Sequence, residues 1–401
     1  MKRRRFISFV FILILCFGMI GCGKEKKIIE SDKFHSDYME IKGGTTTEEG
    51  YFDVINGLSY YVDFETMNAV PICNKPNCRH LSWREDRETK CNAADTSILK
   101  MFPYEDKLYS IRGDSEGGSE LFVSNLDGSN QKTKGRFLEE DEVFAEGVLI
   151  KNQLFFVKEV YLKPDAMSAE SKVEMAMCVL DLNTMKIKEL RRTAGIFSME
   201  LLGGTEEYQI YFEKEENQIK CYRLDYKDSK SQQIILENEP QDVVAASETG
   251  FYYSSGIDFS KEVYRYDFET GKSEIYISED EVRSVLRGDY QILDLWDVRG
   301  KDILFFVWDG IKGELFIKET ESGEIRNLFV SSSLPEGAIL DSLLFRDEEG
   351  VGFSYIKRLE SDQIQWYGYI TWEDMLNGEN NIKVFIEPKL TDLGYPLDEK
   401  E

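Results

Sequence analysis

The residues best suited to chemistry are three cysteines and a histidine that lie close together in the sequence: Cys73, Cys78, His80 and Cys91. Closed structural zinc sites are tetrahedral and use thiolate and imidazole ligands, and three cysteines with one histidine is a standard set. The spacing Cys73-x₄-Cys78-x-His80 lets three ligands surround one ion if Pro76 and the adjacent asparagines make a turn. We therefore predict a structural zinc site that fastens a loop, because four protein ligands leave no open position for catalysis.

Two alternatives to a metal stay open for this segment. The N-terminal sequence, described below, predicts an extracytoplasmic location, where disulfides form and persist. A disulfide would leave one of the three thiols unpaired and would give His80 no role, and free thiols are the third alternative. Cys178 and Cys221 lie in apolar, strand-like sequence, so we expect them to be buried as small hydrophobic residues.

Evidence for catalysis is weak in the rest of the sequence. It contains no P-loop and no H-E-x-x-H motif, and its only histidines are His35 and His80. Carboxylates alone can cleave glycosidic bonds, so a catalytic pair could be present among the 75 acidic residues, although the sequence does not single one out. Acids such as Asp181 and Asp267 lie in turn sequences, and we interpret them as turn residues.

Residues 1–21 have the features of a lipoprotein signal peptide. Four basic residues, 2–5, precede an apolar run of 16 residues, which is shorter than the roughly 20 that a membrane-spanning helix needs. The run ends in Met19-Ile20-Gly21-Cys22, which resembles the bacterial lipobox. The resemblance implies that Cys22 becomes the lipidated first residue of the mature chain and anchors it to the outer face of the cell membrane. An ordinary signal peptide followed by an incidental cysteine is the alternative.

The charge of the chain is strongly negative. The full chain has 49 basic and 75 acidic residues, and removal of the four basic residues of the signal leaves a net charge of 45 − 75 = −30. This balance argues against nucleic acid as a partner, and against docking on anionic lipid or anionic wall polymers. We interpret the acidic surface as one that keeps a tethered protein soluble.

Three regions follow the signal peptide. Residues 22–50 are polar and lack periodicity, which is typical of a tether. Residues 51–388 consist of short apolar-aromatic runs separated by tight turns, and we predict that they form one β-propeller domain. Residues 389–401 are a C-terminal tail that we place near ring closure, where both chain ends would share one blade.

A strand-turn-strand unit recurs in the propeller domain. Each copy has an apolar or aromatic strand, an acidic or amide position, a turn and a second short strand. Most copies follow another strand pair, which gives four strands per repeat with a period of about 40–50 residues. We predict an all-β fold with four-stranded antiparallel blades, seven in number, with six or eight as alternatives; a two-sheet sandwich or tandem β-domains is the competing fold. The copies cover residues 59–72, 121–132, 178–190, 221–236, 263–277, 315–329 and 366–378.

Loop lengths indicate which face is functional. Turns between first and second strands, and most turns between third and fourth strands, are short, whereas connections between blades and between second and third strands are long. In a propeller, the two long classes emerge on the same face, which is where binding residues concentrate. We therefore predict a non-enzymatic module that binds a protein or glycan through this face, with a carboxylate-dependent glycan hydrolase or lyase as the alternative. The long connections are Asn74–Thr96, Gly113–Ser119, Glu159–Ala176, Ser278–Tyr290 and Ser331–Ala338.

The cysteine segment also carries a family resemblance. The string C-N-K-P-N-C-R-H over residues 73–80, followed by C-N-A at 91–93, resembles a group of uncharacterised β-propeller lipoproteins of Gram-positive anaerobes, which have lysine where this chain has Arg79. The specific part covers about 25 residues, and the general resemblance extends from Tyr51 to the end. It implies a propeller, similar in architecture to TolB-like propellers, and an extracytoplasmic location, but no particular activity.

Overall fold

The computed structural model describes residues 38–386 apart from 115–116, 163–171, 195–197, 216–217, 248, 256–261, 286–291, 300–301, 309–312, 329–333, 359–362 and 380. The chain divides into two compact units, Met1–Glu30 and Ser31–Glu401, and every described residue belongs to the second unit. The predicted signal peptide, Cys22 and the tail 389–401 lie outside the described residues. Among the described residues, no helix is long and apolar enough to cross a membrane.

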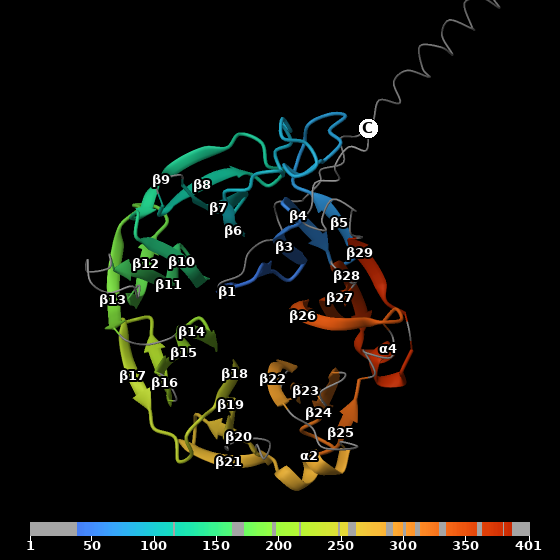
Figure 1. Ribbon diagram of the computed structural model, residues 1–401. Coiled ribbons are helices and arrows are strands. Elements are labelled where there is room, and N and C mark those ends of the chain that lie inside the picture. Colours follow the sequence, from blue (N-terminus) through green and yellow to red (C-terminus); the bar gives the residue numbers. More distant parts are fainter. Residues whose placement is uncertain are drawn as a thin grey trace, which may run out of the picture. The chain divides into compact units, whose positions relative to one another are not determined.

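The described residues form a ring of antiparallel β-sheets, which confirms the predicted all-β propeller with four-stranded blades (Figure 1). Five separate sheets have four strands each, paired in chain order. Their strands are β6 (Ile98–Tyr104), β7 (Lys107–Gly113), β8 (Ser119–Asn125), β9 (Lys132–Leu138); β14 (Ser198–Gly204), β15 (Tyr208–Glu215), β16 (Gln218–Asp225), β17 (Lys230–Ile234); β18 (Asp242–Ser247), β19 (Gly250–Ser255), β20 (Glu262–Asp267), β21 (Lys272–Ile277); β22 (Ile292–Arg299), β23 (Asp302–Trp308), β24 (Gly313–Lys318), β25 (Ile325–Asn327); and β26 (Ala338–Arg346), β27 (Gly350–Arg358), β28 (Gln363–Thr371), β29 (Lys383–Ile386).

The remaining strands form one nine-stranded sheet in the order β13-β12-β11-β10-β1-β2-β3-β4-β5. At one end of this sheet, β10 to β13 repeat the four-stranded pattern, and at the other end β3 to β5 form three longer strands. The short strands β1 and β2 join the two ends. The bounds are β1 (Tyr38–Ile41), β2 (Thr45–Thr46), β3 (Gly50–Ile55), β4 (Leu58–Asp63), β5 (Asn68–Pro71), β10 (Glu142–Ile150), β11 (Gln153–Leu162), β12 (Lys172–Asp181) and β13 (Ile187–Ala194).

The hydrophobic core consists of layers between neighbouring groups of strands. Phe251 of β19 packs with Ile210 of β15 in one layer, and Phe305 of β23 packs with Tyr252 of β19 in the next. Each sheet therefore buries both of its faces against its neighbours, as the alternation of large apolar residues in the repeats requires.

The recurring acidic position is a turn residue, as predicted. The side chain of Asp267, at the end of β20, accepts hydrogen bonds from the backbone N–H and the hydroxyl of Thr270, at 2.8 and 3.0 Å. Asp63 and Asp181 make the same pair of bonds to the threonine three residues later. These Asp-x-x-Thr turns close the connection from third to fourth strand, so the repeated carboxylates have a structural role.

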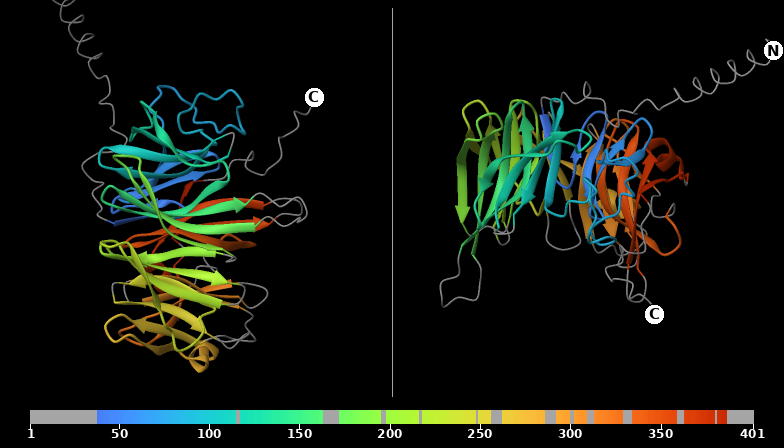
Figure 2. Two further views of the ribbon diagram at one scale, coloured as in Figure 1. Left: turned by 90° about the vertical axis from the view of Figure 1, so that its left-hand side faces the viewer. Right: turned by 90° about the horizontal axis from the view of Figure 1, so that it is seen from above.

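The strand ends define two faces of the ring (Figure 2). We call one the short-turn face; it carries tight turns such as 105–106, 151–152 and 268–271. We call the other the long-loop face; it carries the connections 72–97, 235–241, 278–291 and 328–337, and the end of β11 with the start of β12. One predicted loop is corrected. Residues 159–162 and 172–176 of the predicted loop Glu159–Ala176 are paired strand, since β11 and β12 stay in register as far as Leu162 and Lys172.

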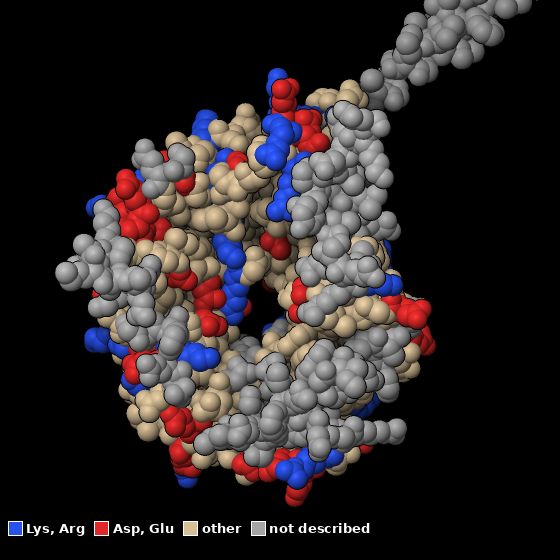
Figure 3. Space-filling view, in the orientation of Figure 1, with Lys and Arg blue, Asp and Glu red and all other residues tan. Residues whose placement is uncertain are grey.

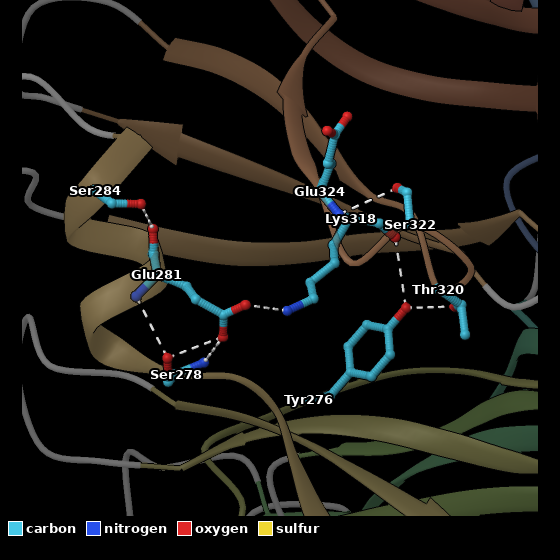
Figure 4. A network of polar contacts seen from close by, with 8 residues as sticks. All are labelled: Tyr276, Ser278, Glu281, Ser284, Lys318, Thr320, Ser322 and Glu324. Atoms are coloured by element: carbon cyan, nitrogen blue, oxygen red, sulfur yellow. Dashed lines mark hydrogen bonds and ion pairs between the residues drawn. The ribbon is translucent and has the colours of Figure 1, made fainter.

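A connection of the long-loop face contains its own folded structure (Figure 4). Helix α2 (Glu279–Val285) begins with a capping box, in which the N–H and hydroxyl of Ser278 donate to the Glu281 carboxylate at 2.8 and 2.9 Å. Glu281 also forms an ion pair with the buried Lys318 of β24. Thr320, two residues after Lys318, contacts the Tyr276 hydroxyl. Helix α2 is thereby attached to the next sheet of the ring.

The predicted tether, residues 22–50, includes residues that belong to the folded domain. Tyr38–Ile41 forms β1, which pairs antiparallel with β10, and Thr45–Thr46 forms β2, which pairs with β3. Met39 and Ile41 are buried, and the Thr45 hydroxyl donates to the backbone oxygen of Met101 at 2.7 Å. The described domain therefore begins by Tyr38 rather than at residue 51, because two apolar side chains and open strand edges outweigh the polar character of the segment.

The two ends of the described domain lie in different sheets, and the tail 389–401 that was predicted to take part in ring closure lies outside the described residues. The last described strand, β29, belongs to a sheet made wholly of C-terminal strands, and β3 to β5 come from the start of the domain. The two ends of the domain meet through side chains, for example the rings of Tyr51 and Phe345, whose centroids are 4.8 Å apart. The β1–β2 hairpin makes a separate backbone connection, which joins β3 to β10.

Candidate metal centre

The structure brings the four predicted ligands together at the base of the connection from β5 to β6. Cys73 follows β5 closely, Cys78 and His80 come from a turn, and Cys91 returns just before β6. The turn is as predicted: the N–H of Cys78 donates to the oxygen of Lys75 at 3.2 Å, with Pro76 between them. His80 has a φ of +51°, so the backbone there is in the left-handed region.

The ligand atoms are close to the geometry of a bound ion. One ligand atom from each of the four residues lies within 4.8 Å of every other. A tetrahedral zinc with bonds of about 2.0 Å to nitrogen and 2.3 Å to sulfur places neighbouring ligand atoms about 3.6–3.8 Å apart. Cys91 Sγ and His80 Nδ1 are already 3.6 Å apart. The donor set therefore fits a tetrahedral ion after at most a small inward movement of the other ligands.

The two buried thiols are held in different electrostatic environments. Burial raises the pKa of the Cys91 thiol to about 12, although the N–H of Ala93 acts in the opposite direction. At Cys73, burial also acts to raise the pKa, but hydrogen bonds from the N–H groups of Lys75 and Asn92 outweigh it and the pKa is lowered. Backbone N–H groups directed at a cysteine sulfur stabilise the thiolate, which is the form that binds metal.

The cysteines carry no disulfide in the described part of the chain, where Cys73, Cys78, Cys91, Cys178 and Cys221 all have free thiols. Cys178 and Cys221 are buried within strands, as predicted for small hydrophobic residues. Cys22, the predicted lipidation site, lies outside the described residues.

The connection of residues 72–97 is anchored mainly at its ends. Cys73 and Cys91 pack with Leu58 and Ala93 in a small apolar cluster, and the N–H of Ser59 donates to the oxygen of Ala93 at 2.8 Å. Further out, the Thr89 hydroxyl donates to the oxygen of Leu81 at 3.1 Å. Between these contacts lies a pocket of about 260 Å³ lined by residues of the turn and by three of the four candidate ligands. A bound ion would therefore replace the core that this connection lacks.

Most of the exposed apolar side chains lie at the long-loop face. This is the face that loop lengths in the sequence indicated as functional. Six of the eight large hydrophobic residues exposed among the described ones lie in its connections or at the adjoining strand ends: Trp83, Leu99, Val143, Tyr161, Leu162 and Ile235. Ile187 begins β13 on the short-turn side, and Ile275 lies within β21. The concentration of exposed apolar surface on one side is typical of a binding surface.

Two acids near the centre of the ring were not predicted from the sequence. Burial raises the pKa of Asp53, on β3, to about 6, and that of Glu146, on β10, to about 7. The Tyr51 hydroxyl donates to Asp53 at 2.8 Å, and the N–H of Leu201 donates to Glu146. The space-filling view shows an opening at the centre of the ring with acidic and basic side chains at its edge (Figure 3). Nothing in the local sequence marks these acids, since each looks like an ordinary polar residue in a strand.

A serine motif in the sequence does not have the setting of a nucleophile. Residues 113–117 read G-D-S-E-G, which matches G-x-S-x-G, the pattern of a strand-to-helix nucleophile elbow. Here the motif connects two antiparallel strands, β7 and β8. Ser115 itself lies outside the described residues, and the one histidine among the described residues, His80, belongs to the cysteine cluster.

Comparison with known proteins supports the fold alone. No family model matches the sequence, and no curated protein matches it. Among solved structures, a prolyl endopeptidase superposes with a TM-score of 0.57 at 9% identity over 88% of this chain and 50% of its own, and a puromycin-hydrolyzing peptidase of Mycobacterium tuberculosis with 0.54 at 9% over 90% and 55%. TolB of Acinetobacter baumannii aligns at 13% identity and a TM-score of 0.43, over 92% of this chain and 86% of its own. The chain spans about half the length of the two peptidases, and it resembles their β-propeller domains.

Proposed function

We propose that this chain is an extracytoplasmic lipoprotein that binds a protein or glycan through the long-loop face of its propeller. The observation that carries the proposal is the concentration of exposed apolar side chains on that face, together with the longest connections of the ring. The lipobox-like sequence ending in Cys22 supports the membrane anchor.

The direction in which the chain enters the domain is consistent with this arrangement. Tyr38 pairs with Ile150, which lies beside the tight turn from β10 to β11 on the short-turn face. The described chain therefore begins at the short-turn face of the ring, opposite to the long-loop face. We propose that the long-loop face is the one presented to a partner.

We propose seven blades for the complete ring. The five separate sheets, the part β10–β13 and the part β2–β5 each have the strand order of one blade, with the two-residue strand β2 in the innermost position of the last. The closing contact between β5 and β29 supports this count, because it places the first blade beside the final one.

We propose that Cys73, Cys78, His80 and Cys91 hold one structural zinc ion. The convergence of four ligand atoms of a standard type supports this choice over a disulfide, which would use only two of them. The ion would stabilise the connection from β5 to β6, and so fix part of the proposed binding face.

Shortening the β11–β12 hairpin tests the binding proposal. Leu162 and Lys172 face each other in register, so an Asn-Gly turn joining them should replace residues 163–171 without disturbing either strand. We expect the variant to fold with unchanged thermal stability and to lose partner capture in pull-downs from cell envelopes. A variant that captures partners as well as the parent contradicts the proposal.

A glycan hydrolase or lyase remains the second candidate because of Asp53 and Glu146. Carboxyl groups with raised pKa are common where acid-base catalysis occurs. A screen of the purified chain against cell-wall and plant polysaccharides should show turnover that is lost in Asp53→Asn or Glu146→Gln. Absence of turnover, or turnover unaffected by both substitutions, contradicts this candidate.

A further inference from the structure

The outer part of the connection from β5 to β6 is basic, in contrast to the rest of the chain. Within residues 74–90 the exposed charged side chains are five cations and a single anion, Glu88, whereas the whole chain has a net charge of −26. The other two acids of the segment are half-buried: Glu85 accepts from the N–H of Ser82 at 2.7 Å, and Asp86 lies 3.8 Å from the Arg79 guanidinium. We call the five cations, with Trp83, the basic loop: Lys75, Arg79, Arg84, Arg87 and Lys90.

The cations of the basic loop are attached to ordered backbone. The candidate metal ligands lie at both ends and in the middle of the segment, and the Lys75 ammonium donates to the backbone oxygen of Lys90. Lys75, Arg79 and Lys90 also line the 260 Å³ pocket beside the candidate ligands. Blue side chains appear at the top of the ring in Figure 3, in the region where Figure 1 draws this connection. Positive charge is therefore presented around a concave surface.

The same connection also exposes an aromatic ring. Trp83 is 41% exposed, and the Arg87 guanidinium carbon lies 3.5 Å from the centroid of its ring. Indole rings pack against the C–H faces of sugar rings, and guanidinium groups bind carboxylates and phosphates with paired hydrogen bonds. The combination of one aromatic plane with several arginines matches a sugar polymer that carries anionic groups.

We propose that the basic loop binds an anionic glycopolymer, a chain of sugar or polyol units bearing carboxylate or phosphate groups. This proposal rests on the proposed function of the long-loop face and names its ligand class. Charges more than about 8–10 Å away are screened at physiological salt. An anionic ligand at the basic loop is therefore attracted by the local positive charge, although the rest of the chain is acidic. The expectation that net charge excludes anionic wall polymers is thereby revised for this surface.

A lipid surface fits the loop less well than a polymer. The basic loop belongs to the long-loop face, whereas Tyr38 enters the ring on the short-turn side. The basic loop also lies within a connection between strands and has no amphipathic helix of the kind that inserts into lipid.

The test compares two triple variants of the full-length, zinc-loaded protein in detergent. Arg79→Ser/Arg84→Ser/Arg87→Ser removes charge from the basic loop. The matched control, Lys132→Ser/Lys186→Ser/Lys227→Ser, removes three exposed cations from positions in or beside turns of the short-turn face. Binding is measured to polygalacturonate, to poly(glycerol phosphate) and to fully methyl-esterified polygalacturonate, and the two anionic probes distinguish carboxylate from phosphate recognition.

We expect at least one anionic polymer to bind, with affinity reduced about 10-fold or more in the loop variant and unchanged in the control, and no binding to the esterified polymer. Trp83→Ala should weaken the same binding about threefold. The proposal is overturned if neither anionic polymer binds, if the loop variant binds within twofold of the parent, or if the esterified polymer binds equally well. Failure of the polymer-binding test would leave the result of the β11–β12 hairpin test unchanged. The two experiments therefore test the two proposals separately.

Discussion

At the scale of single residues, the chemistry of this chain is concentrated in one short segment. The sequence identified Cys73, Cys78, His80 and Cys91 because thiols and an imidazole within 19 residues are unusual, and the structure brings their ligand atoms together. Asp53 and Glu146 could not be identified in the same way. Their raised pKa values arise from burial in the folded ring, which outweighs the opposing effects of Lys100 on Asp53 and of the Leu201 N–H on Glu146.

Removal of one ligand should remove the metal. We expect about one zinc per chain in protein purified without chelator, and a loss of that zinc in His80→Ala or Cys91→Ser because the remaining three ligands bind far more weakly. Metal analysis of the purified chains measures this. Cys221→Ala is the control, since its thiol is buried in β16 away from the cluster, and it should keep the zinc. A metal-free parent whose mass is two hydrogens below that of the reduced chain would assign the segment to a disulfide.

Glu146 should make stability depend on pH. Its pKa is raised by burial from 4.5 to about 7, so between these values the folded chain holds a proton that the unfolded chain has released. The free energy of unfolding therefore falls as pH rises from about 4.5 to 7. Urea titrations at pH 5 and pH 8 should show that Glu146→Gln removes about 1–3 kcal/mol of this decrease. The exposed Glu65→Gln, which does not contribute to the pKa of Glu146, is the control. Equal pH dependence in parent and Glu146→Gln contradicts the assignment.

At the scale of elements, repeated local signals were predictable and long-range pairing was not. The Asp-x-x-Thr turns and the alternation of aromatic residues are local, so the strands around Asp63 and Asp267 follow directly from the sequence. Strand β1 has only the four residues Tyr38–Ile41 within polar sequence, and its partner β10 lies about 100 residues away. No local pattern contains that information, which explains why the segment was interpreted as a tether.

The buried side chains of β1 should contribute measurably to stability. Ile41 is fully buried between β10 and the sheet β6–β9, so Ile41→Ala should lower the free energy of unfolding by about 2–4 kcal/mol. Gly43→Ala, in the adjacent turn, meets no atom within 4 Å and should change it by less than about 0.5 kcal/mol. Urea denaturation followed by tryptophan fluorescence measures both. Equal stability of Ile41→Ala and the parent is the result expected of a tether and would contradict the pairing.

At the scale of the whole molecule, the described residues form a ring with tight turns on one face and long connections on the other. Fold class followed from strand number and period, because a propeller needs only a repeated unit that buries both faces. Loop lengths in the sequence indicated the proposed binding face, and the structure added the exposed apolar residues and the basic loop. Neither could be read from the sequence, because exposure depends on which strand ends meet.

Membrane attachment should depend on a single atom, the sulfur of Cys22. We expect Cys22→Ser to leave the precursor unprocessed or to release the chain from the membrane fraction, because the lipid chains supply the anchoring energy. Fractionation of cells followed by immunoblotting measures this. Normal processing and unchanged membrane partitioning of the variant contradict lipidation.

The central claim, binding through the long-loop face, is tested most directly by replacing exposed apolar residues with serine on one face at a time. Tyr161, 41% exposed, and Leu162, 36% exposed, lie on the long-loop side, and Ile187, 39% exposed, begins a strand on the short-turn side. Each substitution to serine changes a similar exposed area, so all variants should fold equally well. Quantitative capture of envelope components should fall at least about 10-fold in Tyr161→Ser/Leu162→Ser and remain at the parental level in Ile187→Ser. Equal capture by both variants, or a loss confined to Ile187→Ser, contradicts the account.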